Sequence, residues 1–197
     1  MRAGRTLGRL YRRAKPLSPV LPALFFVTDP WRIPHPVRLA KRAPRGLGVI
    51  YRGFGQAKAA RTAQKLAQVA ARRGLTLLIG AGEPRLATAG VHLPERLAAK
   101  ARRFRRRPKL AITAAAHGKA AIRRARLAGC DAVLVSAVFK SASPSAGRPL
   151  GVVRFAALVR DAGLPVYALG GIDGKTARRL IGSGAAGLAA VDAFSSL

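Results

Sequence analysis

The feature of the sequence that most constrains the fold is an alternation of short apolar runs with longer segments whose apolar residues recur at helical spacing. Eight such runs follow one another from residue 23 onward. Continuous apolar runs of this length are typical of parallel strands that are covered on both faces. The runs comprise residues 23–28, 47–51, 75–79, 90–93, 110–113, 132–135, 165–169 and 187–191. This pattern indicates a series of βα units.

The segments between the runs indicate helices with one apolar face and one basic face. In residues 56–73, Lys58, Arg61, Lys65 and Arg72 point away from the apolar face. We expect the apolar faces of successive helices to be formed by Ala59, Ala63, Leu66, Ala67 and Ala70, by Leu97, Ala101 and Phe104, by Ile122, Ala125 and Ala128, and by Ala177, Leu180 and Ile181.

Eight βα units predict an α/β protein with a compact (β/α)8 TIM barrel as a single domain. We place the barrel at residues 21–197, after a basic N-terminal extension of residues 1–20. An open, doubly wound sheet is the structural alternative. It would need a glycine-rich phosphate turn after the first strand, and the Thr-Asp-Pro-Trp sequence of residues 28–31 is not such a turn.

The charge of the chain is strongly unbalanced, with 37 Lys and Arg against 7 Asp and Glu and a formal net charge of +30. Such a charge attracts polyanions of any kind, so we expect non-specific polyanion binding at low salt. We interpret most of this charge as the solvated outer surface of a ring of helices. The densest basic run, residues 102–109, is interpreted as a helix end closed by Pro108, with a polyanion contact as the alternative.

The amino-terminal segment holds six basic residues and no acidic residue between positions 1 and 16. We interpret it as a solvated tail, with a phosphate-binding arm or a targeting segment as the alternatives. The apolar stretch that follows is short and interrupted by Pro19 and Pro22, so it predicts neither a secretory signal nor a transmembrane segment. The single cysteine, Cys130, cannot form an intramolecular disulfide, and we expect a cytoplasmic protein.

Paired glycines follow the seventh run, in the sequence Ala-Leu-Gly-Gly-Ile-Asp of residues 168–173. Glycines allow backbone N–H groups to close around an anion, and a helix that begins directly after them would add its positive dipole end. In TIM barrels a phosphate site commonly lies after strands seven and eight. The sequence therefore predicts a phosphate site at Gly170 and Gly171, with a plain tight turn as the alternative.

Several motifs occur in a characteristic order: Phe-Val-Thr-Asp at 26–29, Gly-Val-His-Leu at 90–93, Ala-Gly-Cys-Asp-Ala-Val at 128–133, Val-Phe at 138–139, Gly-Gly-Ile at 170–172 and Gly-Ala-Ala-Gly-Leu-Ala at 184–189. Over residues 23–194 the chain thereby resembles the thiamine phosphate synthase/TenI family. The resemblance implies a TIM barrel in thiamine metabolism. It also implies a transferase that joins a hydroxymethylpyrimidine diphosphate to a thiazole phosphate, with Mg²⁺ holding the diphosphate.

The sequence departs from the family at the positions that hold magnesium. Of the family's Gln-x-Arg-Glu-Lys pattern after the second strand, only Arg52 is present. The Asn-Asp pair after the third strand is replaced by Gly80 and Ala81, and the acidic position after the fourth strand by Leu97, with Glu95 the nearest carboxylate. The family leads us to expect Mg²⁺ as the cofactor, but its carboxylate ligands are missing, so we assign no metal ligand.

The positions that bind the diphosphate and phosphate also differ. The Thr-x-Thr-Lys clamp of the family corresponds to residues 141–144, where the hydroxyls of Ser141 and Ser143 remain and the lysine does not. Ala137 stands where the TenI branch has a histidine, and Asp192 stands where the family has a phosphate-contacting serine. We therefore expect binding of a thiazole phosphate or thiamine phosphate type of ligand, and we doubt synthase catalysis because the clamp and the metal ligands are degenerate.

The candidate catalytic residues are Arg52 and His117, whereas His92 is interpreted as an interior residue. The expected partner is a phosphorylated small molecule, and a homo-oligomer is left open. One functional alternative is a non-catalytic basic barrel that binds RNA or another anionic partner, and another is an enzyme that uses Asp192 and a histidine as acid and base. The candidate phosphate-binding residues are Thr113, Ser141, Ser143, Gly170, Gly171 and Asp192.

Overall fold

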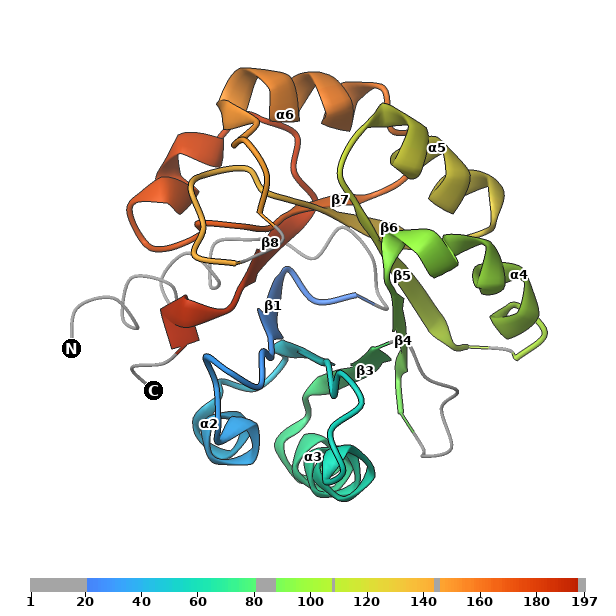
Figure 1. The fold of residues 1–197 in the computed structure, drawn as a ribbon, viewed down its shortest axis with the longest axis vertical. Coiled ribbons are helices and arrows are strands. Elements are labelled where there is room, and N and C mark those ends of the chain that lie inside the picture. The colour runs from blue at the N-terminus through green and yellow to red at the C-terminus, as the bar shows by residue number, and fades with distance from the viewer. Residues whose placement is uncertain (1–20, 81–87, 108, 144–145, 195–197) are drawn as a thin grey trace.

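The computed structural model describes residues 21–80, 88–107, 109–143 and 146–194. Eight parallel strands form a closed barrel in which each strand pairs with its neighbours in the chain and β1 pairs with β8 (Figure 1). The strands are β1 (Leu24–Val27), β2 (Gly48–Tyr51), β3 (Thr76–Gly80), β4 (Gly90–Leu93), β5 (Ala111–Ala116), β6 (Ala132–Val135), β7 (Val166–Ala168) and β8 (Gly187–Ala190). The TIM barrel expected from the sequence is confirmed, and the open sheet is wrong.

Helices lie outside the ring of strands (Figure 1). The α-helices are α2 (Pro36–Arg42), α3 (Ala59–Arg73), α4 (Ala101–Phe104), α5 (Lys119–Leu127) and α6 (Gly151–Arg160), and the 3₁₀ helices are η1 (Glu95–Lys100), η2 (Thr176–Leu180) and η3 (Asp192–Phe194). The units after β7 and β8 therefore contain only short 3₁₀ turns within the described residues. None of the helices in the described ranges is long and apolar enough to cross a membrane.

The helix faces expected from the sequence are largely confirmed. Ala63, Leu66 and Ala70 of α3 are buried, and the burial of Ile122 and of Phe104 agrees with the spacing of apolar residues in α5 and α4. The prediction for Ile181 was wrong, because its side chain is 80% exposed. The helix η2 ends at Leu180 and the backbone of Ile181 is extended, so its side chain leaves the buried face.

The strands begin and end close to the expected positions, with one instructive difference in β5. The apolar run was expected to end at Thr113, but the strand continues to Ala116. It continues because β5 pairs with the full length of β6, up to the pair Ala116 and Val135. The residue that follows, His117, is thereby placed at the carboxyl end of the barrel.

Candidate functional site

A cavity of about 570 Å³ opens at the carboxyl ends of the strands. Its walls come from the loops after β1, β2, β6, β7 and β8, which in a parallel barrel all emerge at the same end. The cavity brings together Arg52, Ser141, Ser143, Gly170, Gly171 and Asp192, which is every candidate residue of the sequence except Thr113 and His117.

The paired glycines after β7 present unpaired backbone donors to this cavity. Gly170 and Gly171 have φ values of 91° and 64°, in the left-handed region that favours glycine. Within the described residues, the N–H groups of Gly170, Gly171 and Ile172 have no hydrogen-bond acceptor. Successive N–H groups in such a turn form a concave site suited to an anion.

The same glycines are also required by packing against the loop after β6. The N–H of Val138 donates to the carbonyl of Leu169 at 2.9 Å, and that of Phe139 donates to the carbonyl of Gly170 at 3.0 Å. A Cβ atom added at Gly171 would overlap the carbonyl oxygen of Lys140. The two loops therefore form one close-packed wall of the cavity.

The helix expected directly after the glycines does not form there, so this part of the prediction was wrong. The next helical turn, η2, begins at Thr176. The carboxylate of Asp173 accepts hydrogen bonds from the N–H groups of Lys175 at 2.7 Å and Thr176 at 2.8 Å. The bond from Thr176 is the main reason why the pKa of Asp173 is lowered. Because Asp173 accepts hydrogen bonds from the first donors of this turn, the backbone donors left at this end of the strand are those of residues 170–172.

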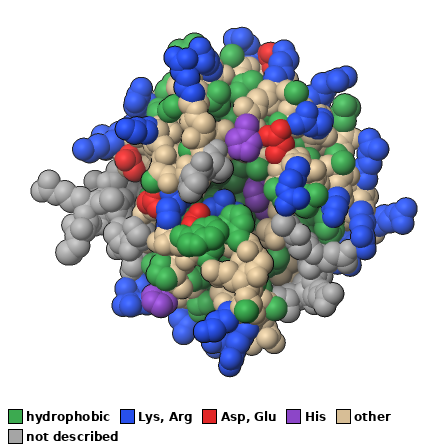
Figure 2. All heavy atoms as spheres, viewed as in Figure 1, with side chains coloured by type: hydrophobic (Ala, Val, Ile, Leu, Met, Phe, Trp, Pro, Cys, Tyr) green, Lys and Arg blue, Asp and Glu red, His purple; other side chains and the backbone are tan. Residues whose placement is uncertain are grey.

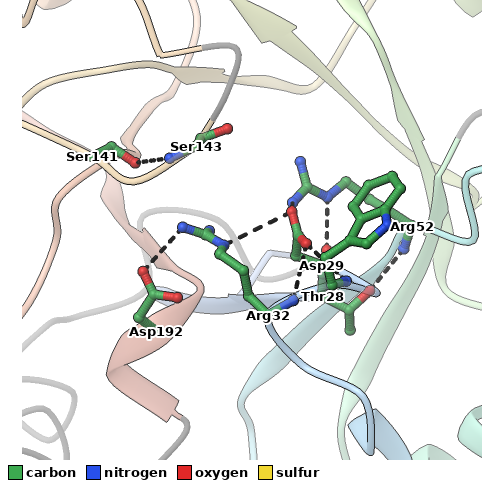
Figure 3. A network of polar contacts seen from close by, with 8 residues as sticks. Thr28, Asp29, Arg32, Arg52, Ser141, Ser143 and Asp192 are labelled. Atoms are coloured by element: carbon green, nitrogen blue, oxygen red, sulfur yellow. Dashed lines mark hydrogen bonds and ion pairs between the residues drawn. The ribbon is translucent and has the colours of Figure 1, made fainter.

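The opposite wall of the cavity carries charges that are paired with one another (Figure 3). The guanidinium of Arg52 donates to the carbonyl of Thr28 at 2.8 Å and lies 3.4 Å from the carboxylate of Asp29. The guanidinium of Arg32 lies between Asp29, at 3.9 Å, and Asp192, to which it donates at 3.0 Å. Two arginines and two aspartates therefore bridge the loops after β1, β2 and β8.

Burial has a clear effect on the Arg52 guanidinium, whose side chain is 25% exposed. Loss of solvent lowers the pKa of Arg52, and the carboxylate of Asp29 opposes that shift. Arginine nevertheless stays protonated in proteins, so Arg52 contributes a fixed positive charge to the wall.

Thr113 does not line the cavity. It is completely buried inside the barrel, where its hydroxyl lies 2.9 Å from Nδ1 of His92. Burial, with a smaller contribution from the charge of Arg52, lowers the pKa of His92 to about 3. His92 is therefore neutral at physiological pH, in agreement with its interpretation as an interior residue, and Thr113 is placed as its partner.

His117 lies in a different groove, of about 730 Å³, beside η1 and α5. Its Nδ1 is 2.7 Å from a carboxylate oxygen of Glu95, and its N–H donates to the same oxygen at 3.1 Å. Arg124 donates to the other oxygen of Glu95 at 2.7 Å. The structure thus joins His117 to the loop after β4 and separates it from the cavity that holds Arg52.

The described residues do not fit a magnesium site. They contain no group of three or more His, Cys, Asp or Glu residues arranged to hold a metal ion. At the mouth, Asp29 accepts hydrogen bonds from the N–H groups of Trp31 and Arg32 and pairs with Arg52, and Asp192 pairs with Arg32. Their oxygens are committed to cationic or N–H donors, which compete with a metal ion for the same lone pairs.

Sequence reasoning missed three features of the cavity walls. Arg32 follows the first strand by five residues, and its place at the carboxyl end of the barrel was available from the strand assignment. Arg179 of η2 lines the cavity, with its guanidinium 5.0 Å from the ring centroid of Phe139. Arg179 was missed because its segment was interpreted as an amphipathic helix whose basic residues face solvent. The N–H of Ile172, which has no acceptor within the described residues, belongs to a turn that the sequence does not reveal.

Comparison with known proteins gives one consistent result. Residues 22–194 match the model of a protein family described as thiamine monophosphate synthase. A protein of Aquifex aeolicus provisionally named thiamine-phosphate synthase 2 is 30% identical over 105 residues, which are 53% of this chain and 56% of that protein. A provisionally named thiamine-phosphate synthase of Geobacter sulfurreducens is 34% identical over 108 residues, 53% of this chain and 50% of that protein. The chain thus spans about half the length of the curated relatives it matches.

Solved structures agree on the architecture. A thiamine phosphate pyrophosphorylase from Pyrococcus furiosus matches with a TM-score of 0.73 at 20% identity, over 85% of this chain and 84% of that chain. A glycerol uptake operon antiterminator regulatory protein from Listeria monocytogenes matches with a TM-score of 0.55 at 12% identity, over 89% and 94% of the two chains. At such low identities these likenesses concern the fold alone.

Proposed function

The chain belongs to the thiamine monophosphate synthase family, and we propose that the mouth of its barrel binds a phosphorylated ligand of the thiazole phosphate or thiamine phosphate type. The observation that carries the proposal is the set of three N–H groups at residues 170–172, which belong to the cavity lining and have no acceptor among the residues that the structure describes. A phosphate group supplies the several acceptor oxygens that such a set of donors requires.

Cations beside the glycines support an anionic ligand. Lys140 and Arg179 line the cavity next to residues 170–172, and in the described part of the chain neither forms an ion pair. The hydroxyl groups of Ser141 and Ser143 lie on the same wall (Figure 3). Lysine can neutralise a phosphate as a point charge, so Lys140 takes over the role of the clamp lysine from a neighbouring position.

The synthase reaction itself is expected to be slow or absent. Ionisation of a diphosphate requires strong neutralisation of the leaving group, which the family achieves with magnesium, and the described carboxylates do not fit that ion. Of the family's Gln-x-Arg-Glu-Lys pattern only Arg52 is present at the mouth, and its guanidinium is engaged by Thr28 and Asp29. What this chain's residues provide is binding and orientation of a phosphate, with a fixed charge from Arg52 nearby.

Two further expectations accompany this proposal. The cytoplasmic location stays a prediction from the single cysteine, Cys130, which is buried and whose pKa that burial raises to about 11. Binding of RNA by the basic surface stays a prediction that we do not favour. On the face drawn in Figure 2, Lys and Arg are spread around the periphery and do not gather into a continuous band.

A thermal-shift titration at physiological salt tests the proposal. The probes are thiazole phosphate, thiamine phosphate, hydroxymethylpyrimidine diphosphate with Mg²⁺, and inorganic phosphate, each added separately. A ligand that binds only the folded state raises Tm with concentration. We expect thiamine phosphate or thiazole phosphate to raise Tm clearly more than inorganic phosphate does. Equal shifts with all four probes would contradict a specific site and point to the basic surface.

A pair of variants locates the site. Lys140→Ala removes a cation beside the paired glycines, and we expect about tenfold weaker binding of thiamine phosphate, which corresponds to the loss of one charge-assisted contact. Lys65→Ala is the matched control, because Lys65 lies on the exposed side of α3 and changes the net charge equally. If both variants weakened binding to the same extent, the effect would come from the overall charge and not from the cavity.

A further inference from the structure

Two aromatic side chains are stacked on the surface beside the cavity. Trp31 follows β1 and Phe54 follows β2, and their ring centroids lie 5.6 Å apart with the planes tilted by 34°. Both rings face solvent, with 77% of Trp31 and 55% of Phe54 exposed. Burial in the core does not explain this pair, and contiguous exposed apolar surface often marks a binding site.

The backbone at Phe54 is held in an unfavourable conformation. Its φ is 43°, and Gly55 follows with a φ of 73°. A bulky residue lacks glycine's freedom in the left-handed region, so this backbone conformation is strained. The backbone conformation places the ring of Phe54 against Trp31, although glycine would fit this position with less strain.

Arg52 connects the aromatic pair to the cavity. Its guanidinium lies 5.1 Å from the ring centroid of Phe54, in the range of a cation–π contact. The same side chain lines the cavity that contains Gly170 and Gly171. Arg32, which also lines the cavity, is the neighbour of Trp31 in the chain. A ligand held by its phosphate at residues 170–172 can therefore extend along the arginines toward the aromatic rings.

We propose that Trp31 and Phe54 form a stacking subsite on the rim of the barrel for a flat heteroaromatic ring, carried by a ligand whose phosphate occupies the cavity. The subsite rests on the proposed function for the position of the phosphate. A flat ring fits because two exposed rings offer faces and edges for stacking but no side-chain hydrogen-bond acceptor. The arginines beside it are already paired with Asp29 and Asp192, so this end of the site favours an uncharged face over a second phosphate.

The fluorescence of Trp31 tests the subsite directly, because Trp31 is the single tryptophan of the chain. The full-length protein is titrated with thiamine phosphate, with thiamine, which has the rings without the phosphate, and with inorganic phosphate, which has the phosphate without the rings. Melting temperature is followed in parallel. We expect thiamine phosphate to quench the emission of Trp31 and to raise Tm, thiamine to quench it more weakly, and inorganic phosphate to leave the emission unchanged.

Phe54→Ala removes half of the stack and keeps the reporter. We expect its affinity for thiamine phosphate to fall about tenfold, as removal of one stacking contact predicts, and its affinity for inorganic phosphate to stay constant. Val153→Ala is the matched control, because Val153 is an exposed apolar residue on α6 that is not part of the cavity lining. The control should bind both probes as the unchanged protein does.

The outcomes separate the subsite from the proposed function. A rise in Tm with thiamine phosphate, without quenching and with unchanged affinity in Phe54→Ala, overturns the stacking subsite and leaves the phosphate site intact. Quenching by thiamine that disappears in Phe54→Ala, without any response to a phosphate group, supports the subsite and overturns the phosphate site. Neither quenching nor a shift in Tm with thiamine phosphate overturns both.

Discussion

The two walls of the cavity use their charges differently. The wall after β6 and β7 leaves its cations Lys140 and Arg179 without an ion pair in the described residues, next to three free N–H groups. On the other wall, the cations Arg32 and Arg52 are engaged with Asp29 and Asp192. The cations of one wall therefore have no carboxylate partner among the described residues, whereas those of the other wall are paired with its own carboxylates.

Under the proposed function, this difference would allow the site to bind the family's class of ligand without catalysing its reaction. Anion binding needs only the donors and cations of one wall. Activation of a diphosphate needs a metal or several cations on the second wall as well, where this chain has formed internal ion pairs. The comparison predicts that substitutions in the two walls have different consequences.

The largest effect is expected when alanine replaces Gly171, in the wall after β7, and the control is the same substitution at Gly55, in the loop after β2. Gly171→Ala combines a positive φ with overlap between the new Cβ and the backbone of Lys140, so we expect a loss of about 3 kcal/mol in the free energy of unfolding and no ligand binding. Gly55→Ala, with a φ of 73° and no atom within 4 Å of its Cβ, is the matched control and should cost about 1 kcal/mol. Urea denaturation measures both.

Equal losses in the free energy of unfolding of Gly171→Ala and Gly55→Ala would contradict this prediction. They would mean that only the backbone conformation of the glycines matters, and that the close packing of residues 170–171 on the loop after β6 has no role. A Gly171→Ala variant too unstable to purify would agree with the larger effect. Gly170→Ala then serves as the milder test, because its Cβ would meet Ala137 at 2.8 Å and leave the carbonyl of Lys140 untouched.

A second prediction concerns His92, which lies in the barrel interior where the charge of Arg52 acts on it. His92 has a pKa of about 3 in the folded protein and an ordinary value near 6.5 when unfolded. Between these values the unfolded chain binds a proton that the folded chain does not, so stability should fall as pH decreases, by about 1.4 kcal/mol per pH unit below pH 6.5. Urea denaturation at pH 7 and pH 5 should therefore differ by about 2 kcal/mol.

His92→Asn separates this titration from that of the carboxylates. The asparagine amide reaches toward Thr113 as Nδ1 of the histidine does, but it does not titrate. We expect the variant to lose most of the pH dependence between pH 7 and pH 5. A variant whose stability followed that of the unchanged protein over this range would show that His92 is not the group responsible.

The fold could be predicted from the sequence because its signal is repeated. Eight apolar runs in fixed alternation with helical segments leave few architectures, and an error at one position, such as the exposed Ile181 or the extended end of β5, does not change the count. The paired glycines could be placed in the site for a similar reason. They follow a strand, and all strand ends of a parallel barrel meet at one mouth.

The remaining features of the site depend on contacts that a linear pattern does not contain. Thr113 was expected at the ligand, but the strand register turns it toward His92 inside the barrel. His117 was a candidate catalytic residue alongside Arg52, but Glu95 holds it in another groove. In the bridge from Asp29 through Arg32 to Asp192, Arg32 and Asp192 are 160 positions apart, and the closure of the barrel between β1 and β8 brings them together.

The smallest effect is expected from Asp192→Ser, and it addresses the comparison most directly. The carboxylate of Asp192 is 62% exposed and lines the cavity, where it accepts a hydrogen bond from Arg32. Its removal takes a negative charge from the mouth and releases Arg32 for a ligand. We expect the affinity for inorganic phosphate to rise about fivefold, an effect of about 1 kcal/mol that should diminish at high salt.

Asp161→Ser is the matched control for this variant, because it raises the net charge equally and removes a partner of Lys119 outside the cavity lining. Calorimetric titration with inorganic phosphate compares the two. A gain in phosphate affinity in Asp192→Ser alone would mean that the carboxylate of Asp192 competes with the ligand for Arg32. A gain of the same size in both variants would mean that the overall charge sets the affinity. In that case the difference between the wall after β6 and β7 and the wall after β1, β2 and β8 has no effect on phosphate binding.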